Sequence, residues 1–157
     1  MLQVVDASAK DELFLYELYI TTRVNDFMML GLDKQQLDAL LHMQFEAQQR
    51  SYGCKFPQAK QEIIYYGEVK IGRMMTASQR ESIHLIDISL LPHFRGKGYG
   101  TKLIQKLLRS AVIRNLPVTL HVATGNPAQR LYERCGFYVT GEAPPYIAMK
   151  WDNFIKY

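Results

Sequence analysis

Residues 83–101 read IHLIDISLLPHFRGKGYGT, and this stretch decides the fold. The side chains of residues 83–90 alternate between two faces with the two-residue period of a β-strand. Residues 95–100 then bring three glycines and two basic side chains, and residues 101–114 carry apolar side chains at helical spacing. The stretch therefore predicts a strand, a glycine-rich loop and an amphipathic helix in direct succession.

The loop has the composition of an anion-binding site. Glycine lets backbone N–H groups turn toward one point, and a helix N-terminus adds open amides and a partial positive charge. Arg95 and Lys97 can add mobile positive charge at the rim. A Walker loop requires GxxxxGK[ST], but the sixth position counted from Gly96 is Thr101, and the glycines stand as GxGxG rather than the dinucleotide pattern GxGxxG. The loop is predicted to bind a phosphate of another kind; the alternative is a turn that only joins strand to helix.

A second stretch, VTLHVATGNPAQRLYERCGF at residues 118–137, has a comparable layout. Residues 118–122 are expected to form a strand. Asn126 is expected to cap a short helix that has Pro127 at its first position and Gly136 just past its end. This second unit again places a helix N-terminus directly after a strand.

The two stretches together resemble the signature of the GNAT acetyltransferase superfamily. The first contains R-x-x-G-x-G, preceded by the run LLPHF at residues 90–94, which is similar to that family's approach to its loop. The second keeps A-x-x-L-Y, from Ala128 to Tyr132, followed by Gly136 and Phe137. Asn126 departs from the family's pattern N-x-x-A-x-x-L-Y, because it lies one residue closer to the alanine.

The resemblance implies that acetyl-CoA is the co-substrate, that its pyrophosphate lies in the loop, and that no metal is needed. In the family, the strand that matches residues 83–90 splays from the next parallel strand, and the pantetheine arm enters the gap and pairs with the strand backbone. A nearby amide would polarise the thioester carbonyl. The cofactor-binding residues that the resemblance implies are Leu90, Leu91, Arg95, Gly96, Lys97, Gly98, Tyr99, Gly100, Thr101 and Asn126.

Tyr132 is the catalytic acid that the resemblance implies. A phenol near the sulfur of coenzyme A can protonate the thiolate as it leaves. The alternative is a packing tyrosine whose hydroxyl finds a surface partner.

Asp87 is the proton acceptor that the sequence itself suggests, since the amine to be acetylated is protonated in water. It is a carboxylate in an otherwise apolar strand, where burial could bring its pKa into a useful range. Asp87 could instead be a structural hydrogen-bond acceptor. The other candidates are three histidines, His84, His93 and His121, and a chain of water molecules. Of the histidines, His121 is expected to share a strand face with Thr119.

The composition fits one α/β domain over residues 1–157, with a central mixed sheet of six or seven strands and about four helices. The net charge of +4 is spread from Lys10 to Lys156, which argues against a nucleic-acid footprint. Neither a signal peptide nor a membrane span is expected, so cytoplasmic location is the default prediction. Further strands are expected at residues 2–5, 62–66, 70–76, 137–140 and 146–151. Helices are expected at 11–23 and 34–52, and the second should be capped by Asp33 and ended by Gly53 and Pro57.

The predicted function is acetyl transfer from acetyl-CoA to a primary amine, either a small molecule or a peptide, with a homodimer left open. Direct attack is favoured over an acetyl-cysteine route, because Cys135 has no histidine beside it in the sequence. In the family, the first two helices and the following hairpin usually build the acceptor pocket. The alternative function is a non-catalytic acyl-CoA-binding sensor or interaction module.

Overall fold

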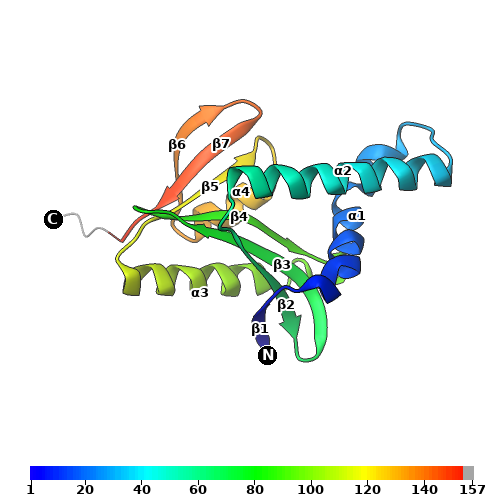
Figure 1. The fold of residues 1–157 in the computed structure, drawn as a ribbon. Coiled ribbons are helices and arrows are strands. Elements are labelled where there is room, and N and C mark those ends of the chain that lie inside the picture. Colours follow the sequence, from blue (N-terminus) through cyan, green and yellow to red (C-terminus); the bar gives the residue numbers. More distant parts are fainter. Residues whose placement is uncertain (154–157) are drawn as a thin grey trace. The chain divides into compact units, whose positions relative to one another are not determined.

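The computed structural model describes residues 1–153, and Figure 1 shows their fold. Among these residues the chain forms seven strands, four α-helices and two 3₁₀ helices. In chain order they are β1 (Leu2–Asp6), η1 (Ala9–Asp11), α1 (Glu12–Met28), α2 (Lys34–Lys55), β2 (Lys60–Tyr66), β3 (Val69–Ser78), β4 (Ile83–Leu90), η2 (Pro92–Phe94), α3 (Tyr99–Arg114), β5 (Val118–Ala123), α4 (Ala128–Arg134), β6 (Tyr138–Ala143) and β7 (Tyr146–Trp151).

The seven strands form one mixed sheet in the order β1-β2-β3-β4-β5-β7-β6. β4 and β5 are parallel and are joined by α3, whereas β1 with β2, β5 with β7, and β6 with β7 are antiparallel. A parallel pair needs a crossover connection, which α3 supplies. The predicted fold class, a mixed sheet of six or seven strands with about four helices, is confirmed.

Two compact units make up the chain. The first comprises Met1–Met74 and Ser89–Phe94, and the second comprises Met75–Ile88 and the chain from Arg95 onward. The boundaries between the units fall within β3 and at the end of β4. No helix among residues 1–153 is both long and apolar enough to cross a membrane.

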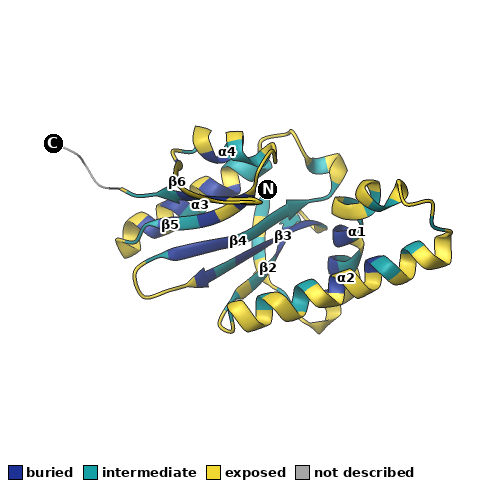
Figure 2. Cartoon of the chain, turned by 90° about the horizontal axis from the view of Figure 1, so that it is seen from above, coloured by how far each residue is buried: buried dark blue, intermediate teal, exposed yellow. Residues whose placement is uncertain are grey.

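The first unit has a core built where α1 and α2 pack on β2. Its buried members are Leu15, Tyr19, Leu41, Phe45 and Ile63. α2 buries only a narrow stripe, and Figure 2 shows most of its surface in the colour of exposed residues. The expected N-cap of this helix is present as a full capping box, in which Asp33 and Gln36 each accept from the other's backbone N–H.

The second unit packs α3 through one buried face, formed by Leu103, Ile104, Leu108 and Ala111. Val112, which the helical spacing assigned to the same face, is 45% exposed. β5 buries every second residue, Val118, Leu120 and Val122, and β7 supplies Ile147 and Met149 to the same core. Figure 1 shows β6 and β7 as a hairpin beside β5, and all six residues of β6 are exposed.

Helix boundaries are where the sequence predictions differ most from the structure. α1 continues to Met28 instead of ending at Arg23, and α2 passes through Gly53 to Lys55. A glycine inside a helix costs about 1 kcal/mol relative to alanine, which is too little to end a long helix that is packed along one face. The chain leaves the helix only at Phe56, directly before Pro57.

Candidate active site

The glycine-rich loop turns through two left-handed positions before α3 begins. Gly96 has φ of 73° and Gly98 has φ of 84°, a region in which a side chain adds about 1–2 kcal/mol of strain. No heavy atom lies within 4 Å of a Cβ built at either glycine, so backbone conformation rather than crowding requires them. Gly98 is the N-cap of α3, and the partial positive charge of a 16-residue helix is directed at this exposed loop.

Gly100 differs from the two glycines before it, because it does not have a positive φ. A Cβ at Gly100 would lie 3.4 Å from Cδ2 of Leu131 on α4, which is van der Waals contact with the end of a flexible side chain. Gly100 thus marks the place where the first turn of α3 lies near α4. Tyr99, Gly100 and Thr101 are half-buried, whereas Arg95 and Lys97 are exposed.

A fork separates β4 from β5. Their parallel pairing joins Ile83 with Val118, His84 with Thr119, and Leu85 with Leu120, and it ends there although both strands continue. Beyond this point the β5 segment at residues 121–123 pairs with β7 on its other side. We call the gap between residues 86–88 and residues 121–123 the fork. Among residues 1–153, one edge of β5 is thereby left without a strand partner at residues 121–123, in line with the splay that the family resemblance implies.

Leu90 and Leu91 lie at the end of β4, tightly packed against β3. The N–H of Leu91 donates to the carbonyl of Ile71 at 2.8 Å, and its own carbonyl accepts from Phe94 at 2.9 Å. A Cβ at Gly72 would lie 2.8 Å from Cδ2 of Leu90 and 2.2 Å from the carbonyl oxygen of Ser89. Both backbone groups of Leu91 are thus hydrogen-bonded within the protein, and its N–H is not available to a ligand.

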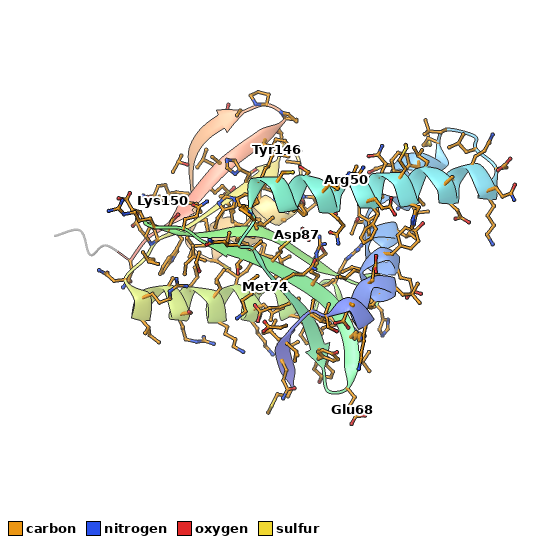
Figure 3. The ribbon with its side chains drawn as sticks, in the orientation of Figure 1. Arg50, Glu68, Met74, Asp87, Tyr146 and Lys150 are labelled. Atoms are coloured by element: carbon orange, nitrogen blue, oxygen red, sulfur yellow. The ribbon has the colours of Figure 1, made fainter. Side chains whose placement is uncertain are left out.

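Tyr132 is buried in the second unit, with 7% of its surface exposed, and its ring packs edge-on against Phe137 with centroids 5.8 Å apart. Burial raises the pKa of its phenol far above the ordinary value, and the negative charge of Asp87 raises it further, with a smaller effect of Cys135. The phenol is therefore held protonated at every physiological pH. The structure brings Asp87, half-buried on β4 and labelled in Figure 3, into electrostatic contact with this phenol.

Asn126 caps α4, as the sequence predicts. Its side-chain oxygen accepts the backbone N–H of Ala128 at 2.9 Å. The residue is exposed at the turn that follows β5. Capping occupies the side-chain oxygen, and the amide nitrogen is a separate donor.

A pair of histidines lies on the strands that form the fork. His84 is 7% exposed, its Nδ1 lies 2.8 Å from the hydroxyl oxygen of Thr119, and its ring centroid lies 5.3 Å from that of His121. Burial lowers the pKa of His84 to about 4, and the nearby His121 contributes to the decrease. The sequence named both histidines as candidates but not their pairing, which depends on the register of β4 against β5. His93, the third candidate, is exposed in η2.

Two groups of titratable residues lie on opposite faces of β4: Asp87 with Tyr132, and His84 with His121. Strand side chains two residues apart share a face and those three apart do not, so His84 and Asp87 point to opposite sides. Asp87 acts on Tyr132 on one side of the second unit, and His84 contacts Thr119 and His121 on the other. Titratable side chains thus lie on both faces of the fork.

Comparison with known proteins identifies a family for this chain. A family model described as the acetyltransferase (GNAT) family matches residues 14–137. No curated protein sequence matches the chain.

Several solved structures share the fold. The PaiA N-acetyltransferase of Thermoplasma acidophilum, in complex with coenzyme A, has a TM-score of 0.74 at 12% identity and covers 98% of this chain and 99% of its own. An acetyltransferase of Thermus thermophilus has a TM-score of 0.67 at 15% identity, over 96% and 95% of the two chains. Naa50 of Arabidopsis thaliana, in complex with the bisubstrate analogue CoA-Ac-MVNAL, has a TM-score of 0.61 at 15% identity, over 98% and 99%. Since the family model spans most of the chain, and the sheet and its helices agree, the chain belongs to the GNAT family of acetyltransferases.

Proposed function

We propose that this chain, as one domain over residues 1–157, transfers the acetyl group of acetyl-CoA to a primary amine by direct attack of the amine nitrogen. The observation that carries the proposal is the buried side chain of Tyr132, whose phenol interacts electrostatically with the carboxylate of Asp87 on one of the two strands that form the fork. A phenol that keeps its proton near neutral pH is available to hydrogen-bond the leaving thiolate, or to protonate it as the carbon–sulfur bond breaks.

The loop and the start of α3 supply the proposed site for the pyrophosphate of coenzyme A. Two glycines with positive φ and the N-terminus of a long helix favour an anion there, and Arg95 and Lys97 add charge at the rim. The pantetheine arm would pair with the open edge of β5, which offers backbone groups in strand geometry. The further contacts proposed are with Leu90, Leu91, Gly96, Gly98, Tyr99, Gly100, Thr101 and Asn126.

The two catalytic residues serve different atoms in this proposal. The amine nitrogen bonds to the acetyl carbon and the carbon–sulfur bond breaks. Tyr132 donates its proton to the sulfur. The sequence suggested Asp87 as the acceptor of the ammonium proton; because Asp87 interacts with Tyr132, we assign to it instead the proton that the nitrogen loses once the new bond has formed. In this proposal the proton then passes from Asp87 to the Tyr132 phenolate, directly or through water, and resets the site.

Direct attack is supported by the state of the cysteine nearest to the site. Burial raises the pKa of the Cys135 thiol above its ordinary value. The thiolate, which is the nucleophile, is thereby disfavoured, and an acetyl-cysteine intermediate with it. Cys54, the other cysteine, is exposed on α2 in the first unit.

A small-molecule amine or a peptide amine is the proposed acceptor, and the cytoplasm is the proposed location. The Arabidopsis relative, whose bisubstrate analogue carries the sequence MVNAL, supports including peptides among the candidates. Two reduced cysteines on separate elements are compatible with a reducing compartment.

The proposal is tested by incubating the chain with acetyl-CoA and a panel of amines and peptides. Thiol release and the mass of the acetylated product are measured together, because hydrolysis of acetyl-CoA would release thiol without a product. Amine-dependent thiol release with a matching product supports the proposal. Tight binding of acetyl-CoA by calorimetry without transfer to any amine would contradict it and favour an acyl-CoA-binding module.

A further inference from the structure

The histidine pair on the face of the fork opposite Tyr132 has no part in the chemistry described so far. His121 is exposed and is the first β5 residue beyond the last pair with β4, so its side chain stands where the two strands separate. Behind it lies His84, buried and in contact with Thr119. His121 thus presents an exposed imidazole, which can accept a proton, at the point where the thioester would lie, and the buried imidazole of His84 packs against it.

Acetylation of an amine requires two protons to leave the nitrogen. The acceptor enters as an ammonium ion and must lose one proton before its lone pair can attack. It loses the second after the new bond forms, and that proton balances the one given to the sulfur. Tyr132 and Asp87 account for the second proton, which leaves the first without an acceptor.

We propose that His121 accepts the proton that the acceptor ammonium loses before attack, and that His84 and Thr119 are positioning residues for its ring. This inference rests on the proposed function. His121 then releases the proton to water, to which it is exposed. The net reaction yields the acetylated amine, free coenzyme A thiol and one proton in solution.

The contacts of His84 suit it to a positioning role. Its ring lies 5.3 Å from that of His121, and the 2.8 Å contact with the Thr119 hydroxyl fixes the orientation of the ring. Because the pKa of His84 is lowered to about 4, the ring is neutral at physiological pH and does not repel a proton that arrives on His121. A buried neutral imidazole is thus a partner that does not compete for the proton.

The other polar groups on this face come from the neighbouring strands. Ala148 of β7 lies opposite His121, Lys150 lies opposite Thr119, and Tyr146 lies opposite Ala123. Figure 3 labels Lys150 and Tyr146 toward opposite ends of β7. Tyr138 of β6 lies opposite Lys150, and its hydroxyl donates to Asp152 at 2.5 Å. No carboxylate stands directly opposite His121 in this register.

The test compares the full-length wild type with His121→Gln, which keeps hydrogen-bonding capacity but cannot take a proton near neutral pH. The acceptor is the alkylamine that gives the most thiol release with wild type. The matched control is His42→Gln, a change of an exposed histidine on α2 in the first unit. kcat/KM is measured from pH 6 to pH 10.

We expect His121→Gln to lose about 10²- to 10⁴-fold at pH 7, and to regain activity as the pH approaches the pKa of the amine and the acceptor deprotonates in solution. His42→Gln should follow wild type throughout. No loss in His121→Gln, or an equal loss at every pH, would overturn the inference while the proposed function stands. A wild type that acetylates no amine would instead refute the proposed function, and the inference with it.

A second measurement does not depend on turnover. The imidazole signals of His84 are titrated by NMR in wild type and in His121→Gln. Since His121 contributes to the lowered pKa of His84, its removal should raise that pKa toward the ordinary value. An unchanged pKa of His84 would show that the two rings are not coupled and would count against the positioning role.

Discussion

Acidification should destabilise this protein through His84, and the size of the effect can be estimated. Above about pH 6.5 the imidazole is neutral in both the folded and the unfolded chain, so it contributes nothing to the pH dependence. Between about pH 6.5 and about pH 4 the unfolded chain binds a proton that the folded chain excludes, and the free energy of unfolding falls as the pH falls. Below pH 4 both states are protonated and the loss stays constant.

The magnitude follows from the difference between the two pKa values. A decrease from 6.5 to about 4 corresponds to about 3 kcal/mol. The ring is 7% exposed, so a little solvent screening remains, and a loss of about 2–3 kcal/mol is expected. Domains of this size are stable by about 5–15 kcal/mol, so this one residue would remove a substantial fraction of the total.

The assay is urea denaturation at pH 7, 6, 5 and 4, with His84→Phe as the comparison. Phenylalanine keeps a ring in the same buried position but does not titrate. Asp11, whose pKa is lowered by its hydrogen bond and charge interaction with Lys70, also makes the fold less stable in acid, but it does so equally in both proteins. Wild type should therefore lose about 2–3 kcal/mol more than His84→Phe between pH 7 and pH 4, and parallel curves would refute the reasoning.

Three further changes probe the site directly. Gly98→Val places a β-branched side chain at φ of 84° and should abolish acetyl-CoA binding in calorimetry. The melting temperature should show that the domain is still folded. Unchanged affinity would exclude the loop as the phosphate site. Tyr132→Phe keeps the buried ring and should lower kcat by about 10²- to 10⁴-fold with acetyl-CoA still bound, an expectation that a fully active variant would disprove. Asp87→Asn should fold normally and lose the acidic limb of the pH–rate profile; a lower melting temperature with an intact profile would mean that the carboxylate is structural.

The sequence was sufficient to predict the parts of the fold in which local signals agree. β4 has the bounds that the alternation over residues 83–90 predicts, and the expected cap of α2 by Asp33 is present. Asn126 caps α4 despite its shifted place in the motif, because capping depends on a side-chain oxygen near the first amides rather than on a family spacing.

What the sequence could not predict depends on the register between strands and on packing. The contact between His84 and Thr119 exists because these two residues are paired across β4 and β5, and no local pattern contains that information. The loop glycines are similar: Gly98 meets a backbone requirement that a local pattern can suggest, whereas the proximity of Gly100 to Leu131, which comes 31 residues later in the sequence, depends on packing. Gly53 was expected to end α2 because the low helix propensity of glycine is visible in the sequence. The packing of the helix on the core, which offsets that penalty, is not.

The fork has a consequence for how this sheet avoids self-association. An open strand edge invites pairing with another chain, and proteins usually protect such edges with charges, prolines or bulges. β6, at the end of the sheet, has an irregularity between Val139 and Gly141 and is followed by Pro144 and Pro145. The open edge of β5 instead lies in the interior of the sheet, beside a strand to which it is joined through three residue pairs. A strand of another chain could reach this edge only by entering between β4 and β5, so the fork keeps an unpaired strand edge without exposing an outer edge to self-association.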